Sequence, residues 1–500
     1  MSGGNGEDTL VGRSASRGED THAGRSASRG EDTHAGRSAS RGEDTPGVAV
    51  EERIVALRDE LDDALWCTLT APLEIDGTRF TASLEPPDGE SMARALRVLG
   101  ECGLAVVIRG GGSRMGLGNP PRGADLLLST RCLAGVDEFE PAEGVLHAGA
   151  GTGLEELRAI AQAEGWELAM DPPGQGTTLG GVIASAAIGP RYTGFGPVRD
   201  SVLGLEVALA TGERTHCGGR VVKNVTGYDL AKLYTGSLGT LGVIEGAWLR
   251  LRPQPEVVML RVAEIRDSRE GIERGIELGR RSSARVAALL SSGIARSLGL
   301  GDLLSPGSCG VMVCELAGDA VECEGDARWL EETLGASQLE VGAASRLVGG
   351  LRARLGARLG PRALRARIAL TPGGVDRVCE PLAAAGAELI VQPSAGLVFA
   401  ELSWEDDDAE APPKASEDSK CAGAASEAAP VRAASQALEC VGEAARTAGG
   451  VLVVEEIPAW AKAGRDMFGD AGGTLSLMRS VKARFDPKGT LNPGRFAGGL

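Results

Sequence analysis

In Val107-Ile-Arg-Gly-Gly-Gly-Ser-Arg-Met-Gly-Leu-Gly118, an apolar run leads directly into a glycine-rich turn. Two later segments have the same character, Thr178-Leu-Gly-Gly-Val-Ile-Ala-Ser185 and Gly236-Ser-Leu-Gly-Thr-Leu-Gly-Val-Ile244. A pyrophosphate needs several main-chain N–H groups converging on it, and glycine lets the chain approach closely and turn with positive φ. The chain has 74 glycines among 500 residues, so one cluster would mean little. Three beside apolar runs indicate a large phosphate-bearing cofactor held by main chain.

The first loop does not follow the dinucleotide-binding pattern of a Rossmann fold. That pattern needs Gly-x-Gly-x-x-Gly after a strand and at the start of a long helix. Leu104 to Ile108 is typical of a buried strand, but the glycine spacing is wrong and Asn119-Pro120-Pro121 prevents a continuous helix. A tight turn without a ligand remains the alternative for Gly110 to Gly112.

The length, net charge and cysteine spacing of the chain exclude several classes of protein. The length of 500 residues predicts at least two domains. The net charge of −17 argues against nucleic acid or an anionic membrane as the main partner. The ten cysteines include no Cys-x-x-Cys spacing, so neither a zinc site nor an iron–sulfur cluster is expected in this chain, and no metal ligands are predicted. No apolar run approaches the roughly 20 residues of a membrane span. We expect a cytoplasmic protein, or one at the inner face of the membrane only through partners.

The pattern along the chain predicts four parts. Residues 1–47 contain a polar repeat of twelve residues, Gly-Arg-Ser-Ala-Ser-Arg-Gly-Glu-Asp-Thr-His-Ala, and are expected to be a disordered tail. Residues 48–255 should form an α+β domain, with a hairpin over Val202 to Cys217. Residues 256–478 should form a second α+β domain, the cap region, with a disordered insertion at 405–434 and an amphipathic surface helix over Leu347 to Arg367. Residues 479–500 form the C-terminal segment.

Several motifs in fixed order carry a resemblance to a known family. After the first two glycine segments come Gly189-Pro-Arg-Tyr-Thr-Gly-Phe-Gly-Pro-Val-Arg-Asp200, Lys223-Asn-Val-Thr-Gly-Tyr-Asp-Leu230 and the third glycine segment. Lys482-Ala-Arg-Phe-Asp-Pro-Lys-Gly-Thr-Leu-Asn-Pro-Gly-Arg495 follows near the end. This order resembles the PCMH-type FAD-binding domain of the vanillyl-alcohol oxidase family, and within it the FAD-binding subunits of bacterial glycolate oxidase. The resemblance implies an FAD domain of two α+β subdomains, a cap domain, and a C-terminal segment that returns to the flavin.

The resemblance also implies which residues bind FAD. The glycine loop and Ser113 would contact the pyrophosphate, the second segment would begin a helix facing it, and the third would lie along the flavin. The full set is Gly110, Gly111, Gly112, Ser113, Thr178, Gly180, Gly181, Ser185, Gly189, Ser237, Gly239, Thr240, Gly242, Ile244 and Asn492. Several family members attach FAD covalently through a His at the position of Ser113, so we expect non-covalent FAD. Alternatively, Ser113 only caps the turn.

The candidate catalytic residues are Arg191, Lys223, Asn224 and Tyr228. A Lys and a phenol near a flavin can orient a carboxylate or polarise an oxygen. Alternatively, Lys223 pairs with Asp229 on the surface while Tyr228 packs in the core. Arg191 could bind the carboxylate of a 2-hydroxy acid with two hydrogen bonds, or contact a phosphate instead.

The positions of the histidines do not supply the base that related dehydrogenases use. Related dehydrogenases use a His in the second domain as the base, whereas Glu256 to Leu500 contains no His. The resemblance to glycolate oxidase implies a subunit that helps oxidise glycolate or a similar 2-hydroxy acid and passes electrons to an iron–sulfur subunit, beside a homologous flavin subunit. The alternatives are a stand-alone FAD-dependent D-lactate or 2-hydroxy acid dehydrogenase, and a non-catalytic FAD-binding assembly subunit.

Overall fold

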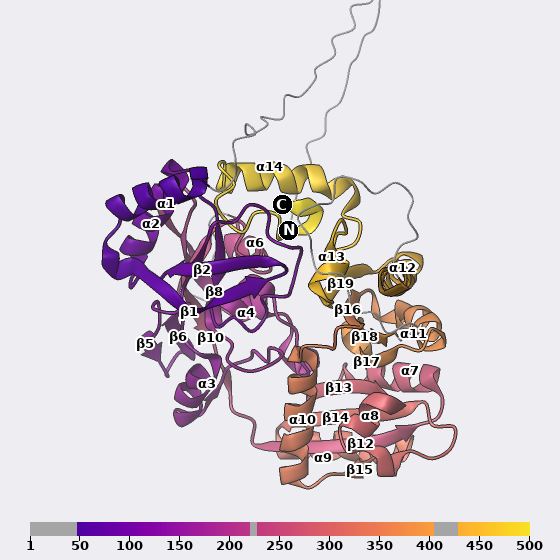
Figure 1. Ribbon diagram of the computed structural model, residues 1–500. Coiled ribbons are helices and arrows are strands. Elements are labelled where there is room, and N and C mark those ends of the chain that lie inside the picture. Colours follow the sequence, from indigo (N-terminus) through magenta and orange to yellow (C-terminus); the bar gives the residue numbers. More distant parts are fainter. Residues whose placement is uncertain (1–47, 221–227, 405–428) are drawn as a thin grey trace, which may run out of the picture. The chain divides into compact units, whose positions relative to one another are not determined.

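The computed structural model describes residues 48–220, 228–404 and 429–500 (Figure 1). They all belong to one compact unit, Gly47–Leu500. Helices and sheets are mixed throughout this unit, so the predicted α+β class is confirmed. The expected tail and most of the expected insertion lie outside the described residues. None of the described helices is long and apolar enough to cross a membrane.

The first sheet has the order β1-β2-β4-β3 and carries the first glycine loop at its edge strand. β1 (Trp66–Ile75) and β2 (Thr78–Leu84) form an antiparallel hairpin, while β4 (Leu126–Ser129) is parallel to both β2 and β3 (Val106–Arg109). α1 (Val48–Glu60) and α2 (Gly89–Glu101) pack against its apolar core. The loop after β3 runs to β4 without a helix, as the Asn-Pro-Pro sequence predicts.

The second sheet is antiparallel, with the order β5-β6-β10-β8-β9. Its strands are β5 (Val136–Glu140), β6 (Val145–Gly149), β10 (Val243–Arg250), β8 (Val202–Ala208) and β9 (Arg214–Gly218). β8 and β9 are the predicted hairpin. A two-stranded ribbon and four helices complete this part: β7 (Trp166–Glu167), β11 (Arg252–Pro253), α3 (Leu154–Ala163), α4 (Leu179–Ser185), α5 (Tyr192–Phe195) and α6 (Leu230–Tyr234).

The cap region contains one antiparallel sheet of eight strands in the order β15-β12-β14-β13-β17-β18-β16-β19. The strands are β12 (Val257–Ile265), β13 (Ala284–Ser291), β14 (Gly310–Gly318), β15 (Ser337–Gln338), β16 (Ala363–Ala369), β17 (Glu388–Gln392), β18 (Leu397–Ser403) and β19 (Val451–Glu456). Their period-two alternation gives the sheet two different faces. One is almost entirely apolar, and the other carries charged side chains at its β16 end.

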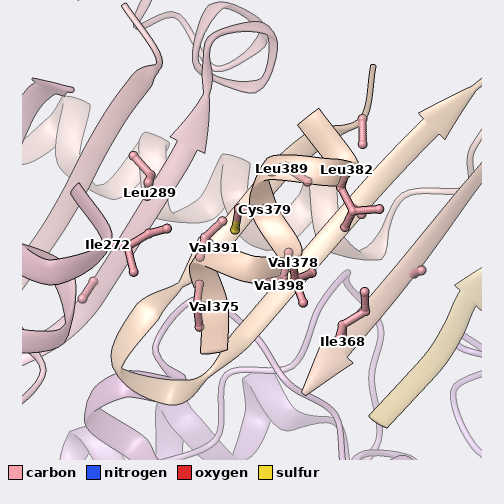
Figure 2. Close-up of a cluster of buried hydrophobic side chains, with 14 of the residues drawn as sticks. Ile272, Leu289, Ile368, Val375, Val378, Cys379, Leu382, Leu389, Val391 and Val398 are labelled. Carbon is pink, nitrogen blue, oxygen red and sulfur yellow. The ribbon is translucent and has the colours of Figure 1, made fainter. Parts of the chain in front are cut away.

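Helices cover both faces of this sheet. Figure 2 shows the apolar face, where α11 contributes Val375, Val378, Cys379 and Leu382 to a cluster with side chains from β13, β16, β17 and β18. The helices on that side are α7 (Ser268–Leu278), α9 (Ala320–Leu334), α11 (Val375–Ala384) and α12 (Ala429–Ala448). α8 (Ser292–Ser297) and α10 (Val341–Gly356) pack on the other face. α13 (Ala459–Lys462) and α14 (Leu475–Phe485) follow β19.

Two predicted boundaries in the cap region are wrong. The expected helix over Leu347 to Arg367 ends at Gly356, and its second half is strand β16. The alternating sequence Ala363-Leu-Arg-Ala-Arg-Ile-Ala369 places Leu364, Ala366 and Ile368 in the core, while Arg365 and Arg367 find acidic partners on the opposite face. The expected insertion ends early, because α12 begins at Ala429 and packs Ala434 and Val441 into the core.

The C-terminal segment returns to the first sheet, as the resemblance implies. Leu491 pairs with Val106 in a parallel bridge, and the Val106 N–H donates to the Thr490 carbonyl over 2.8 Å. Asp486 fixes the turn before this bridge by accepting the main-chain N–H groups of Thr490 and Leu491, each at 2.8 Å. The last residues of the chain therefore lie beside the loop that follows β3.

Candidate functional site

One cavity brings the three glycine segments and the C-terminal segment together. Its open space is about 840 Å³, including the part open to solvent. Twelve of the fifteen predicted cofactor-binding residues line it: Gly110, Gly111, Gly112, Ser113, Thr178, Gly180, Gly181, Ser185, Gly239, Gly242, Ile244 and Asn492.

The loop after β3 forms the first wall. A Cβ at Gly111 would lie 2.0 Å from the Gly176 carbonyl oxygen, and one at Gly110 would lie 2.3 Å from Thr178 Oγ1, so only glycine fits at both positions. The Gly111 N–H donates to Thr178 Oγ1 over 3.1 Å, which holds the loop against α4. Gly112 has a φ of +80° and turns the chain back. Among the described residues, no protein acceptor is found for the N–H groups of Gly112, Ser113 and Arg114.

Helix α4 and the third glycine segment, which leads into β10, form the other walls. α4 begins at Leu179 after Thr178, and the Gly180 N–H donates to the Ala150 carbonyl over 2.8 Å. A Cβ at Gly180 would lie 2.8 Å from the Ala150 Cβ, so this glycine permits close packing of the helix. In the third segment, Leu238 and Gly239 both have positive φ.

Asn492 joins two walls of the cavity. Its Oδ1 accepts the Ile108 N–H over 2.9 Å, and its Nδ2 donates to the Leu238 carbonyl over 2.6 Å. Asn492 itself has a φ of +45°, a conformation that Asn tolerates better than most residues. The C-terminal segment therefore fixes the distance between β3 and the third glycine segment.

A buried ion cluster holds the far end of the glycine loop. Lys462 of α13 is 1% exposed, and its Nζ donates to Asp76 Oδ2 over 2.9 Å and to the carbonyls of Gly116 and Gly118. Arg495 also contacts Asp76 and donates to the carbonyls of Met115, Leu117 and Asn119. Burial lowers the pKa of Lys462, and the attraction of Asp76 opposes this. Residues from three parts of the chain thus fix one loop.

A second, smaller cavity adjoins the first and shares Ser113, Arg114 and Met115 with it. Its open space is about 410 Å³, Gly116 and Leu117 of the same loop also line it, and its remaining walls come from the cap region. Four charged residues besides Arg114 line it: Arg358, Arg365, Glu455 and Glu456. Buried Nε of Arg114 and buried Oε2 of Glu455 have no hydrogen-bond partner among the described residues. Unpartnered buried polar atoms beside a cavity are suited to a small polar ligand.

Glu455 and Glu456 differ in their surroundings although they are neighbours. Glu455 Oε1 accepts from Arg367 Nε over 2.8 Å and lies 3.4 Å from an Arg114 nitrogen. Burial alone would raise the pKa of Glu455, but Arg114 and Arg367 outweigh it and the pKa is lowered. Burial raises the pKa of Glu456, and no hydrogen-bond or ion-pair partner is found for Glu456 in the described part of the chain. The pKa values of these two neighbouring carboxyl groups are therefore shifted in opposite directions.

Three predicted cofactor residues lie away from the first cavity. The Thr240 hydroxyl donates to the Ser237 carbonyl over 2.8 Å, and both side chains are buried within the turn. Gly189 faces the cap region, where its carbonyl accepts Gln392 Nε2 over 3.0 Å. A Cβ there would lie 1.6 Å from the Asp171 carbonyl oxygen, so packing explains this glycine.

Of the predicted catalytic residues, neither Arg191 nor Tyr228 lines either cavity. The Arg191 guanidinium contacts Glu315 of β14 with two hydrogen bonds, at 2.7 and 2.8 Å, instead of facing the cavities. Tyr228 is 93% exposed, so the alternative that it packs in the core is wrong. Asp229 pairs with Lys232 over 2.8 Å. Lys223 and Asn224 lie outside the described residues.

The sequence analysis missed Arg114, Glu455, Glu456 and Lys462. Arg114 follows Ser113 in the quoted loop and could have been found there. Glu455 and Glu456 end an apolar strand, where two adjacent carboxylates are unusual. Nothing in the sequence indicates which cavity their side chains line. In the described ranges, no group of three or more His, Cys, Asp or Glu side chains is placed to hold a metal ion.

Several known proteins are similar to this chain in sequence or in fold. Residues 81–218 match the family described as FAD binding domain. "Glycolate oxidase subunit GlcE" of Escherichia coli (strain K12) is 39% identical over 152 residues, which are 30% of this chain and 43% of that protein. Mitochondrial D-2-hydroxyglutarate dehydrogenase of Bos taurus is 38% identical over 176 residues, or 35% of this chain and 32% of that protein. D-lactate dehydrogenase of Archaeoglobus fulgidus is 36% identical over 171 residues, which are 34% of this chain and 38% of that protein. The matches span less than half of each relative.

The fold similarity extends further along the chain. The structure of p-cresol methylhydroxylase with bound substrate superposes with a TM-score of 0.64 at 14% identity, covering 89% of this chain and 96% of that one. The chain therefore contains a PCMH-type FAD-binding domain, and FAD is confirmed as its cofactor. The first cavity fits this group, because the N–H groups of Gly112, Ser113 and Arg114, for which the described residues offer no acceptor, could donate to a diphosphate.

Proposed function

We propose that this chain is an FAD-dependent oxidoreductase that oxidises glycolate or a similar 2-hydroxy acid to the 2-oxo acid, as the FAD-binding subunit of a complex of the glycolate oxidase type. One observation carries the proposal: a small charged cavity shares the wall Ser113, Arg114 and Met115 with the cavity suited to FAD. A small acid bound there would adjoin the cofactor. The names of the relatives, which act on glycolate, D-2-hydroxyglutarate and D-lactate, support the substrate class.

The main chain would hold FAD. The N–H groups of Gly112, Ser113 and Arg114 would donate to the diphosphate, and Gly239, Gly242 and Asn492 would line the rest of the cofactor. When bound, FAD supplies the hydride acceptor for an alcohol carbon. Thr178 and the cluster of Asp76, Lys462 and Arg495 would keep the loop in place. Of the predicted residues, Ser237, Thr240 and Gly189 would act only through packing.

Arg114 would bind the carboxylate of the substrate. Its Nε is buried and unpartnered, and a guanidinium matches a carboxylate with paired N–H donors. Arg358 lines the same cavity and adds positive charge. The cavity is small, which favours an acid of few carbons. Arg191, committed to Glu315, would serve the contact between the FAD domain and the cap region instead.

Partners would complete electron transfer. The described cysteines are free and lack cluster spacing, so an iron–sulfur subunit would take the electrons, beside a homologous flavin subunit. The Escherichia coli relative is named as a subunit, which supports this assembly. The complex would be cytoplasmic, or held at the inner membrane face by its partners.

A stand-alone 2-hydroxy acid dehydrogenase is the second candidate. It is favoured by the presence of both cavities within this chain and by the similarity to D-lactate dehydrogenase. This candidate requires turnover by the isolated chain, whereas a purely structural FAD subunit predicts no flavin reduction even in the complex.

The first test is an anaerobic visible spectrum of the FAD-loaded chain before and after glycolate, and then D-lactate. We expect bleaching of the flavin, because the substrate site and FAD site lie in the same chain. The matched variants are Arg114→Gln, which should raise the concentration of acid needed for half-maximal bleaching at least tenfold, and exposed Arg346→Gln, which should not change it. An oxidised flavin that persists with both acids, alone and in the complex, would leave the non-catalytic subunit as the function.

A further inference from the structure

Oxidation of an alcohol carbon requires a group that takes the hydroxyl proton, and this chain has no His in Glu256 to Leu500. The two histidines of the described residues lie elsewhere. His147 is on β6, with Nδ1 3.0 Å from Asp137 Oδ2 and its ring against Trp248. His216 is exposed on β9. Among the described residues that line the two cavities, the carboxyl groups are those of Glu455 and Glu456.

We propose that the Glu456 carboxylate is the base of this site and accepts the hydroxyl proton of the 2-hydroxy acid. The inference rests on the proposed function. The O–H bond breaks, its proton goes to a Glu456 carboxylate oxygen, and its electron pair forms the C=O bond. The hydrogen on the same carbon would leave with its two electrons as hydride, for which bound FAD would be the acceptor, so the acid would lose two electrons and two protons in total.

The position of Glu456 at the end of β19 supports this role. The ladder between β16 and β19 is irregular between Arg365 and Ala366, and Glu456 pairs opposite Arg365 beyond that irregularity. A Cβ at Gly116 would lie 3.1 Å from Glu456 Oε2, so the glycine loop leaves room for the carboxylate at this point. Glu456 therefore reaches the same small cavity as Arg114, which would hold the acid.

Glu455 is unsuited to the same task. Its Oε1 is bound by Arg367 and lies near Arg114, and these two cations hold it ionised and weakly basic. It would orient Arg114 toward the substrate. Glu456 has no such pair in the described residues, and a carboxylate with a raised pKa is a stronger base near neutral pH.

Charged groups from four other elements surround Glu456. They are Lys462 of α13, Arg358 after α10, Arg365 of β16 and Asp76 in the turn between β1 and β2. Burial is the largest influence on Glu456 and raises its pKa, the three cations lower it, and Asp76 raises it. The basic form of Glu456 therefore increases as the pH rises through a pKa above the ordinary Glu value of 4.5.

The test compares wild type with Glu456→Gln, Glu456→Asp and the exposed control Glu443→Gln of α12, all loaded with FAD. In anaerobic stopped flow with the better of glycolate and D-lactate, Glu456→Gln should reduce its flavin about 10²–10⁴-fold more slowly. Glu456→Asp should recover part of the rate. Wild type and Glu443→Gln should share one pH profile, rising through the pKa of Glu456, and Glu456→Gln should lack that rise.

A binding measurement accompanies the rates because it does not depend on turnover. Oxalate resembles the substrate but cannot be oxidised in this way, and its binding beside the flavin should change the flavin spectrum. Ionised Glu456 repels an anion, so oxalate affinity in the wild type should fall as the pH rises, and this fall should disappear in Glu456→Gln. Unchanged rates and an unchanged pH dependence in Glu456→Gln would overturn the role of Glu456 alone. A wild-type flavin that no hydroxy acid reduces would instead overturn the proposed function, and this inference with it.

Discussion

Ser113 stands on the wall shared by the two cavities. Ser113 is exposed, and its N–H has no acceptor among the described residues. It follows Gly112, whose positive φ turns the chain. A residue here touches whatever occupies either cavity. Its hydroxyl can donate a hydrogen bond, but it cannot form the bond that an imidazole makes to a flavin.

We therefore expect that FAD is bound without a covalent link. Precipitation of the holoprotein with trichloroacetic acid should release all the flavin into the supernatant, because no side chain tethers it once the fold is lost. The measurement is the flavin absorbance of supernatant and redissolved pellet. Yellow colour that stays with the pellet would contradict this prediction and point to another attachment residue.

At the scale of single elements, Arg365 links the end of α10 to strand β16. It is 2% exposed, and its guanidinium donates to Glu401 and to the carbonyls of Arg354, Leu355 and Ala357. These carbonyls belong to the last turn of α10 and the residue after it, where helical acceptors are left without partners. One side chain thus ends the helix and satisfies a buried carboxylate on β18.

Replacement of Arg365 by Met should lower the free energy of unfolding by roughly 3–5 kcal/mol, because it leaves Glu401 buried with only Arg354 as a cation. The double variant Arg365→Met/Glu401→Leu should lose less than the sum of the two single variants, with a coupling of about 1–3 kcal/mol. Urea unfolding followed by circular dichroism measures both values. Exposed Arg346→Met on α10 is the control. Strict additivity would mean that the pair does not act as a unit.

At the scale of the whole described unit, ion pairs join the FAD domain to the sheet and to helix α10 of the cap region. Arg191 contacts Glu315, Arg285 contacts Glu167, and Arg352 contacts Asp171. Gly194 packs so closely on β13 that a Cβ would lie 2.7 Å from the Arg285 Cα. The motif that begins at Gly189 therefore serves domain contact, although its place in the sequence resembled a cofactor wall.

Replacement of Arg191 by Ala should reduce the free energy of unfolding by about 2 kcal/mol, because Glu315 would lose its pair at 4% exposure while Arg191 is itself partly solvated. FAD content and the concentration of hydroxy acid that half-reduces the flavin should stay as in the wild type. Chemical unfolding and anaerobic titration measure the two effects. The control is Arg199→Ala, an exposed residue with only a 3.9 Å contact to Asp200. Loss of substrate binding with intact stability would restore Arg191 as a carboxylate ligand.

The FAD cavity was largely predictable because local sequence demands it. Gly110, Gly111 and Gly112 are required where backbone meets backbone, and such positions stand out in a sequence. The strands flanking them were predictable from apolar runs. Strand β16 was not, because alternating Arg and apolar residues also suit a surface helix, and only the buried partners Glu401 and Glu455 decide in favour of a strand.

The sequence by itself indicated the α+β class and a large phosphate-bearing cofactor, because glycine turns and apolar periodicity are local properties of the chain, and the order of its motifs carried the resemblance that implies FAD. Only the tertiary structure decided that Arg191 binds Glu315, and that Arg114 meets Glu455 and Glu456. The first contact joins residues about 125 positions apart in the sequence, and the second joins residues about 340 positions apart. The sequence around a charged side chain does not indicate which residue it will pair with. Its charge state depends on its burial and on its distance from other charges, and both are set only when the sheets have packed.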